Sequence, residues 1–543
     1  MNETTDPIQT QNAQTPPPYD TDAQGDSIKE TIESVVIALI LAFVFRAYVV
    51  EAFVIPTGSM APTLLGQHLR VTCNQCGYQF TVDPDERSRT EQRRGLEFQA
   101  NYLTRTVTVI CPMCHNEIII DRGTRISAGD RILVHKYIYS FAEPKRWDVV
   151  VFKNPQEPQV NFIKRLVGLP NERLWIIHGN LYVRSPGDAD FHIARKGDRP
   201  QAQRAVWQPV YYSRYVPLDY AQRTTGPNAW HTPWVAQSGH WELQGRRSYQ
   251  CMDQTGGSII FDFNRAKPRH GSWYPYDQAK SRYLSPEPIE DVRLAAAFQP
   301  AAEGLSIALT TTARLGLHSR DAGRLPVRAA IDAKGHATLS TLDPDYNKTI
   351  VLADTQLHPL PAGETTPVEL WYVDQQASMW VNHRRVLTWQ YDLDFQTIRE
   401  RRPPPMTPSI SIEVHGSAVT LHQVQIDRDL YYSDHNQNQQ ARGSTHRRNG
   451  FPPRPVTLGP DHFFCMGDNS PMSSDGRYWN EPQDWIEYRL FQDWVARGND
   501  PAGLVPRPLM MGRAFFVYFP APYGLDPKRR GFIPNFGDMR FIH

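Results

Sequence analysis

The sequence has little cysteine, almost no net charge and no basic residue near its start. Six cysteines in 543 residues are too few for a scaffold held together by disulfides. Lys and Arg number 58 against 57 Asp and Glu, so the formal charge of +1 offers no attraction to nucleic acid, which we exclude as a partner. No Lys or Arg precedes Lys29, which argues against a cleaved secretory signal, because such a signal begins with a basic segment.

Long hydrophobic runs are also scarce, and the most prominent one lies near the N-terminus. Residues 1–27 are polar and acidic, which predicts a disordered tail. An apolar run from Val35 to Phe45 follows, is interrupted by Arg46 and then resumes. A membrane span needs roughly 20 apolar residues, and this run reaches that length only if Arg46 extends towards the lipid headgroups. We predict a single-pass transmembrane anchor over 28–50, whose orientation the few flanking charges leave undecided.

The remainder of the chain predicts a mainly β protein of two to four domains. Abundant proline (45) and frequent Trp and Tyr suit short strands and loops better than helical bundles. Segments with the character of strands lie at 130–134, 147–152, 161–167 and 512–519.

A long insertion, 185–460, separates the third of these strands from the fourth. Apolar residues alternate with polar ones along several of its segments, which predicts a β-sandwich over about 241–432. The segments that alternate are 292–298, 305–309, 410–414 and 419–426, and 368–374 with 379–382 has the pattern of two paired strands.

The first segment with chemical potential runs from Ile55 to Leu64. It places Ser59 between a glycine and a methionine, with a proline on each side, so the backbone is constrained and the hydroxyl is able to point into a cleft. The alternative is an idle serine in a surface turn, since Gly-Ser next to Pro is common in loops.

The second segment is the strand around Lys164. Strand alternation places Phe162, Lys164 and Leu166 on one face, so the amine has apolar neighbours and loses solvation. This lowers its pKa and lets a neutral lysine accept a proton, at a cost of roughly 3 to 4 kcal/mol of stability for two to three pKa units. The adjacent Arg165 cannot do this, because guanidinium does not deprotonate in proteins. The alternative is a lysine that reaches out to solvent.

The third segment, Met466 to Trp479, is dense in Asp, Asn, Ser and Gly, which by itself predicts a hydrogen-bonded turn. Within it, Asp475 and Arg477 have the charges to pair and brace the loop, and a serine hydroxyl there is able to orient the lysine.

Four of the six cysteines form two CxxC pairs, Cys73 with Cys76 and Cys111 with Cys114. Such pairs fit four thiolates around a structural zinc ion, and we favour zinc over the alternative of disulfides. We predict that the other two, Cys251 and Cys465, are buried thiols rather than partners in a disulfide.

Taken together and in chain order, these segments resemble the sequence boxes of the type I signal peptidases, or leader peptidases. The resemblance covers about a third of the chain. The boxes are 56–64 for the nucleophile, 129–134 for the next strand, 163–170 for the lysine and 467–477 for the last.

The resemblance implies a membrane-bound serine endopeptidase that removes N-terminal signal peptides from exported preproteins through an acyl-enzyme. Its partners would be those signal peptides and the lipid bilayer, and catalysis would need no cofactor. The expected location is the cytoplasmic (inner) membrane, with the catalytic domain on the extracytoplasmic side.

The resemblance also implies a role for each matching residue. Ser59 would be the nucleophile and Lys164 the general base. Ser473 would hold the lysine amine, while Asp475 and Arg477 would support its loop. The oxyanion would meet the Ser59 backbone N–H and the hydroxyl of Thr57, where the family often has serine. Shallow pockets would accept small residues before the cut; the candidates for their lining, each equally well explained as plain core, are Ile55, Met60, Leu64 and Ile163.

The fold expected from this resemblance is an all-β catalytic domain interrupted twice. Its parts are 51–70, 128–184 and 461–543. The first interruption, 71–127, is the zinc-ribbon-like insert. The second carries the β-sandwich, which loosely resembles laminin-G and concanavalin-like domains and serves as a spacer or binds an unknown ligand.

Two other functions compete with this reading. A self-cleaving Ser/Lys repressor-like protein shares the dyad, but it would lack an anchor and carry a helical DNA-binding module. A membrane-tethered binding or scaffold protein with a vestigial peptidase domain would be expected to lose Ser59 or Lys164, and both are present.

Overall fold

The structure is a computed structural model with a mainly β fold. By contacts the chain divides into two compact units, Met1–Glu51 and Ala52–His543. The residues that the structure describes are 22–48, 50–84, 102–223, 225, 229–266, 275–278, 289–313, 325–343, 347–400, 407–433, 448–526 and 529–543.

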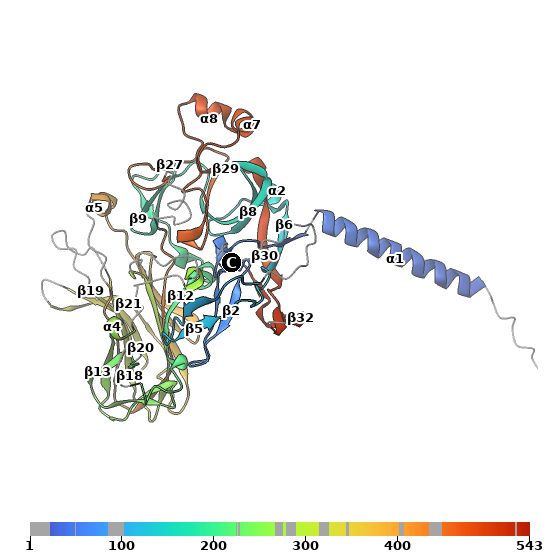
Figure 1. Ribbon diagram of the computed structural model, residues 1–543. Coiled ribbons are helices and arrows are strands. Elements are labelled where there is room, and N and C mark those ends of the chain that lie inside the picture. Colours follow the sequence, from blue (N-terminus) through green and yellow to red (C-terminus); the bar gives the residue numbers. More distant parts are fainter. Residues whose placement is uncertain are drawn as a thin grey trace, which may run out of the picture. The chain divides into compact units, whose positions relative to one another are not determined.

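The first unit contains helix α1 (Asp22–Tyr48; Figure 1) and the first two residues of strand β1 (Val50–Val54). The helix begins inside the predicted tail, and the remainder of that tail, 1–21, lies outside the described residues. Asp22, Asp26 and Glu33 are among the polar residues of its first half, so the unbroken apolar stretch is short for a span. Across the described residues, no helix is both long enough and apolar enough to cross a membrane. The predicted transmembrane anchor over 28–50 is therefore not confirmed.

The second unit begins with an eight-stranded sheet, in which the described pairings are antiparallel. The predicted strand segments at 130–134, 147–152, 161–167 and 512–519 correspond to β6, β7, β8 and β30. In sheet order the strands are β1 (Val50–Val54), β6 (Arg131–Lys136), β30 (Met510–Phe519), β7 (Val149–Asn154), β8 (Glu157–Gly168), β28 (His462–Met466) and β29 (Leu504–Pro506), and β33 (Arg540–Phe541) pairs with β30.

Both faces of this sheet are covered, which explains the continuous apolar run of β7. Val149 and Val151 point into one core, with Ile132 and Val134 of β6. Val150 and its neighbour Phe152 belong to a second, larger core. Successive strand residues point to opposite faces, so a strand with a core on each side needs apolar residues at every position.

A smaller four-stranded sheet brings the two ends of the long insertion together. Strands β9 and β10 form a hairpin whose two turn residues, His178 and Gly179, both have positive φ, as tight hairpin turns require. Strand β27, near the end of the insertion, pairs with β9, which precedes the insertion. The order is β11 (His192–Ile193), β10 (Asn180–Arg184), β9 (Arg173–Ile177) and β27 (Val456–Thr457).

Two short hairpins carry the cysteine pairs. The first contains β2 (Leu69–Thr72) and β3 (Gln79–Val82). The second contains β4 (Val107–Ile110) and β5 (Glu117–Ile120). Residues from both hairpins share one small apolar core, and this shared core holds the hairpins together.

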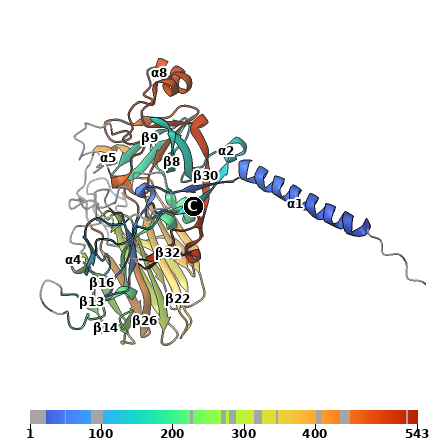
Figure 2. The ribbon, with the colours of Figure 1, turned by 45° about the vertical axis from the view of Figure 1, so that its right-hand side comes forward.

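The middle of the chain forms two sheets on one shared core, as predicted for a β-sandwich (Figures 1 and 2). The segments 368–374 and 379–382 do pair, with Leu370 opposite Met379. One sheet runs β14 (Trp241–Gln244), β15 (Ser248–Cys251), β26 (Val419–Arg428), β17 (Val292–Pro300), β22 (Thr366–Val373), β23 (Gln376–Val381) and β24 (Arg384–Gln390), with β12 (Gln208–Tyr212) on β26. The other runs β13 (Trp234–Ser238), β16 (Gly257–Phe261), β25 (Ile410–His415), β18 (Ser306–Ala313), β19 (Leu325–Ile331), β20 (His336–Leu342) and β21 (Thr349–Gln356). Strands β12 and β13 thus extend the sheets to residues before 241.

Short helices and one further hairpin complete the described elements. The helices are α2 (Ile138–Phe141), α3 (Pro200–Val206), α4 (Phe263–Ala266), α5 (Phe395–Glu400), α7 (Asp484–Ile486) and α8 (Gln492–Ala496). The hairpin is β31 (Tyr523–Asp526) with β32 (Arg529–Ile533), and the 3₁₀ turns used below are η1 (Gly58–Met60) and η5 (Pro275–Asp277).

Candidate active site

Ser59 lies in the short turn η1, just after strand β1. Met60 and Leu64 are fully buried in the core beneath the turn, so the apolar residues that follow Ser59 anchor the turn. The amide of Ala61 donates to the carbonyl of Gly58 at 3.0 Å, which closes the turn. Ser59 itself is half-buried, with its hydroxyl directed towards Lys164.

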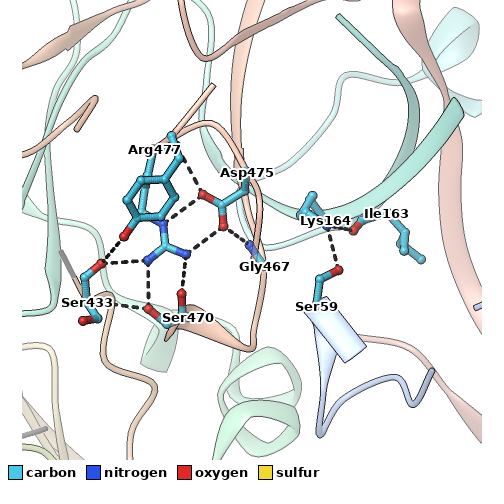
Figure 3. Close-up of polar contacts among 9 residues, drawn as sticks. Ser59, Ile163, Lys164, Ser433, Gly467, Ser470, Asp475 and Arg477 are labelled. Atoms are coloured by element: carbon cyan, nitrogen blue, oxygen red, sulfur yellow. Dashed lines mark hydrogen bonds and ion pairs between the residues drawn. The ribbon is translucent and has the colours of Figure 1, made fainter. Parts of the chain in front are cut away.

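Lys164 lies on β8, in register with Val150 of β7. Its amine donates hydrogen bonds to Ser59 Oγ at 2.8 Å and to the carbonyl oxygen of Ile163 at 3.0 Å (Figure 3). The ring of Phe162 lies 5.1 Å from the amine. Only 3% of Lys164 is exposed, which rules out the alternative of a lysine that reaches out to solvent.

Burial lowers the pKa of the Lys164 amine to about 8, although the charges of Asp475 and Asp468 act in the opposite direction. Both partners of the amine, a hydroxyl and a carbonyl, are neutral, so neither fully offsets the lost solvation of the charged form. A substantial fraction of this amine is therefore unprotonated near pH 8. In that form the amine accepts a hydrogen bond from Ser59 across the same contact.

Asp475 and Arg477 form a buried ion pair beside this site (Figure 3). The guanidinium donates from Nε to Oδ1 at 2.9 Å and from Nη2 to Oδ2 at 2.8 Å, and neither side chain has any exposure. Asp475 also accepts the Gly467 N–H at 2.9 Å, and Arg477 donates to Ser470 Oγ at 2.8 Å. The pair therefore ties the two ends of the 467–477 loop together, and its supporting role in catalysis stays a prediction.

Ser473 is fully buried in the same loop. It lies close to Gly467, where a Cβ would come within 2.2 Å of Ser473 Oγ and 2.4 Å of the Ser59 carbonyl oxygen. The loop thus needs glycine at 467 in order to pass between Ser473 and the nucleophile turn. The hydrogen bond expected from Ser473 to the Lys164 amine stays a prediction.

Asn469 is a residue whose role the sequence did not indicate. Its backbone N–H donates to the Ser59 carbonyl at 3.0 Å, and its side-chain amide donates to the Gly58 carbonyl at 3.0 Å. The 467–477 loop thereby binds the carbonyl groups of both Gly58 and Ser59. The only signal in the sequence was the place of Asn469 in a stretch rich in Gly and Asp. Such residues predict a turn but do not show which other segment the turn contacts.

Arg165 is the second residue whose structural role the sequence did not indicate. It is fully buried and forms a two-pronged pair with Asp468, with both nitrogen–oxygen distances at 2.7 Å. It also donates to the carbonyl of Trp147 at 2.8 Å. Bidentate pairs of this kind fix geometry as well as charge, so Arg165 joins β8 to the loop that carries Asn469.

The predicted oxyanion donors belong to the same short segment of the chain. Thr57 precedes the turn in an extended conformation and is exposed. Its hydroxyl and the Ser59 N–H are thus on the segment where a substrate carbonyl would approach Ser59. Their role as oxyanion donors stays a prediction.

The predicted pocket residues do not share one environment. Ile55, Met60 and Leu64 are at most 2% exposed and pack in the core with Ile132 and Val134. Their burial agrees with the alternative that they are plain core. Ile163 keeps partial exposure at the edge of that core, and its role in a pocket stays a prediction.

The four cysteines of the CxxC pairs come together in one cluster. Their sulfur atoms all lie within 4.8 Å of one another, with 3.5 Å between Cys73 and Cys114 and 3.6 Å between Cys76 and Cys111. These distances are far longer than the roughly 2.05 Å of a disulfide. Four thiolates at Zn–S distances of about 2.3 Å in a tetrahedron lie about 3.7 Å apart, so the cluster is able to hold a metal ion.

The two hairpins present these cysteines in the same way. In the first, the Cys73 N–H donates to Tyr78 and its carbonyl accepts from Gly77. In the second, Cys111 makes the equivalent bonds with Asn116 and His115.

None of the six cysteines, all of them among the described residues, forms a disulfide, and the remaining two are fully buried in separate parts of the fold. Cys251 lies on β15 of the sandwich and Cys465 on β28, near Lys164. The prediction of buried thiols is confirmed. Burial raises the pKa of the Cys465 thiol, so it stays neutral beside the amine.

A serine hydroxyl in contact with a buried lysine amine, on an antiparallel β framework, has the arrangement of a serine-type hydrolase. The chain belongs to the family described as signal peptidase, peptidase S26, whose model matches residues 28–94, 123–217 and 407–519. The matched regions contain Ser59, Lys164 and the 467–477 loop. They leave out most of the sandwich and the second cysteine hairpin.

Individual relatives match parts of the chain. Signal peptidase I of Pseudomonas aeruginosa is 36% identical over 92 residues, which are 17% of this chain and 26% of that protein. Signal peptidase I of Rickettsia typhi is 26% identical over 158 residues, which are 29% of this chain and 44% of that protein. The chain therefore spans less than half the length of these two relatives. Among solved structures, the carbohydrate-binding module CBM66 from Bacillus subtilis matches 36% of this chain and 96% of its own, with 11% identity and a TM-score of 0.23.

Proposed function

We propose that this protein is an endopeptidase that removes N-terminal signal peptides from exported preproteins. The observation that supports this most is the 2.8 Å contact between the Ser59 hydroxyl and the buried amine of Lys164, in a chain of the signal peptidase family. In this proposal the unprotonated amine removes the hydroxyl proton as Ser59 attacks the scissile carbonyl.

The remaining steps of the proposal use the residues that the family resemblance assigns. The new C–O bond places negative charge on the carbonyl oxygen, which the Ser59 N–H and the Thr57 hydroxyl would stabilise. The protonated Lys164 then gives its proton to the leaving amine as the peptide bond breaks, leaving an acyl-enzyme. A water molecule, deprotonated by Lys164, attacks the ester and releases the signal peptide with a free carboxylate, and Ser59 regains its proton.

The test is cleavage of a preprotein whose signal peptide ends in a small-x-small site. The detergent-solubilised full chain should cleave it once, and Ser59→Ala should lose about 1,000-fold or more in rate, as removal of a nucleophile does in other serine peptidases. If Ser59→Ala cleaves at the rate of the parent, Ser59 is not the nucleophile. If neither protein cleaves, the vestigial peptidase of a binding or scaffold protein is the better account.

We further propose that the protein acts at the extracytoplasmic side of the cytoplasmic membrane. Support comes from the family and from the apolar side chains that α1 exposes, such as Ile37, Ile40 and Phe43, each more than half exposed. After cell fractionation, the chain should sediment with membranes and resist a carbonate wash. Release by that wash would contradict anchoring through α1.

For the four-cysteine cluster we propose structural zinc, which the spacing of the sulfur atoms supports. The purified chain should contain about one zinc ion per molecule, and Cys76→Ser should lower that content. An absence of metal together with four oxidised thiols would contradict the proposal. The sandwich is proposed as a spacer, with an unidentified glycan or peptide ligand as the alternative.

A further inference from the structure

A short piece of the large insertion reaches the nucleophile turn. It consists of η5 (Pro275–Asp277) and Gln278, whose neighbours in the sequence on each side lie outside the described residues. Tyr276 and Asp277 are both nearly or fully buried, at 5% and 0% exposure. They are therefore packed against other parts of the protein, although they lie more than 200 residues from Ser59 in the sequence.

Asp277 contacts the nucleophile turn through Asn469. The side-chain nitrogen of Asn469 donates to Asp277 Oδ1 at 3.0 Å and to the Gly58 carbonyl at 3.0 Å. An amide nitrogen has two hydrogens, so these two bonds use both and fix which end of the amide faces the turn. With the amide reversed, its oxygen would face both the Asp277 carboxylate and the Gly58 carbonyl, so three acceptor oxygens would lie together with no hydrogen of the Asn469 side chain between them.

The side chain of Tyr276 packs against Gly58 of the nucleophile turn. A Cβ on Gly58 would lie 2.3 Å from the Tyr276 ring, so the ring occupies the space that any other residue at 58 would need. The Tyr276 hydroxyl donates to the carbonyl of Gln67 at 3.3 Å, just beyond the nucleophile segment. Glycine at position 58 is thus explained by the ring that covers it rather than by an unusual φ.

The same piece also contacts both cysteine hairpins. The Tyr276 carbonyl accepts from the Asp83 N–H at 2.7 Å. The Gln278 side chain accepts from the Ile110 N–H at 2.7 Å and donates to the Ile110 carbonyl at 3.3 Å. Residues 275–278 are thereby attached to a module with its own core, which gives them a fixed position from which to hold the turn.

We propose that Asp277 is a positioning residue that holds Ser59 in line with Lys164 by orienting Asn469, with Tyr276 as the wall on the other side of the turn. The inference rests on the proposed function and adds that a residue of the insertion completes the peptidase site. Because the side-chain amide of Asn469 holds the Gly58 carbonyl, a reversed amide would shift the peptide unit that leads into Ser59 and so displace its hydroxyl. A displacement of about 1 Å at a reacting group lowers rates by roughly 100-fold.

The kinetic test compares Asp277→Ala with Asp277→Asn in the full chain. Asp277→Ala should lower kcat by about 10- to 100-fold with KM within about twofold of the parent, since substrate contacts are unchanged. Asp277→Asn keeps an acceptor oxygen and should restore most of the rate. Asn469→Ala should be equally slow, and adding Asp277→Ala to it should cause no further loss, because Asp277 acts through Asn469.

The matched control is Asp332→Ala, which removes an exposed turn carboxylate of the same insertion and should leave kcat unchanged. Parental kcat in Asp277→Ala, or equal losses in Asp277→Asn and Asp277→Ala, would overturn the proposal.

A second measurement does not depend on peptidase activity. Hydrogen exchange at the amides of Ala61 and Leu64, which close the nucleophile turn, should be faster in Asp277→Ala and unchanged in Asp332→Ala. Unchanged exchange in Asp277→Ala would overturn the positioning role. Faster exchange in a chain that cleaves no preprotein would support the role of Asp277 while contradicting the proposed function.

Discussion

The protein buries two lysines to the same degree and places them in opposite electrostatic settings. Lys164 and Lys196 are 3% and 2% exposed, and each amine lies about 5 Å from an aromatic ring, of Phe162 and Trp147 respectively. The Lys164 amine contacts a hydroxyl and a carbonyl. The Lys196 amine lies 3.0 Å from an oxygen of Asp374 and 2.9 Å from one of Asp429.

The pKa values move in opposite directions as a result. Burial lowers the pKa of Lys164 to about 8. Burial alone would also lower the pKa of Lys196, but the carboxylates of Asp374 and Asp429 outweigh it and raise that pKa above the ordinary value. Burial therefore makes a lysine into a base only where no carboxylate contacts its amine, and the comparison separates a catalytic amine from a structural one.

The largest expected difference between the two lysines is in activity. Lys164→Arg should lower preprotein cleavage by about 1,000-fold or more, because guanidinium stays protonated and cannot accept the Ser59 proton. Lys196→Met should keep the parental rate per folded molecule. Cleavage assays on both variants, normalised to folded protein, test this, and retained activity in Lys164→Arg would remove the base assignment.

The second difference is in stability. Lys196→Met leaves Asp374 and Asp429 buried without their cation, which should lower the free energy of unfolding by about 3 to 5 kcal/mol. Denaturant unfolding near pH 7 measures this, with Asp332→Ala as the control for a lost surface carboxylate. An unchanged unfolding free energy would mean that the ion pairs of Lys196 contribute nothing.

The third difference also concerns the free energy of unfolding, but here the substitution should raise it. Lys164 has a folded pKa near 8 and an unfolded value near 10.5, so its unfolded state holds more protons between these pH values and stability rises with pH there. Below pH 8 the cost is fully present, at about 3 kcal/mol from 1.36 kcal/mol per pKa unit. Lys164→Met should therefore stabilise the inactive protein at pH 7, and this gain should fade as the pH approaches 10.5. Equal destabilisation by both Met variants would contradict the comparison.

The smallest expected effect comes from giving Lys164 a carboxylate of its own. Phe162 is partly exposed and lies beside the amine, so Phe162→Glu should raise the pKa of Lys164. The pH midpoint of kcat/KM should move upwards by about one unit, or roughly tenfold in rate at pH 7. Phe162→Gln is the uncharged control. The same midpoint in both variants would show that the pKa of Lys164 does not limit the rate.

Local pattern predicted much of the fold and the buried amine of Lys164, whereas only the family resemblance paired that amine with Ser59. The apolar neighbours of Lys164 on its strand indicated a desolvated amine, and the alternation in 368–374 and 379–382 indicated two strands that pair. These signals are local, since strand period and neighbouring side chains determine them.

Other features depend on contacts between distant segments and have no local pattern. Asn469 bonds to Gly58 across 411 residues and to Asp277 across 192. The burial of Ile55, Met60 and Leu64 depends on which strands pack over them. The sequence therefore could not decide whether these three residues line a substrate pocket or belong to the core. The prediction of a membrane anchor was based on the apolar run, whereas helix α1 also includes the polar residues that precede this run.

The most direct test of the account is a titration of the Lys164 amine itself. With isotope-labelled lysine, its NMR signal should titrate near pH 8 in the folded chain, and the midpoint of the pH profile of kcat/KM should coincide with it, while Lys196 stays protonated throughout. A Lys164 amine that titrates above pH 10, in a protein already fully active at pH 7, would contradict the account.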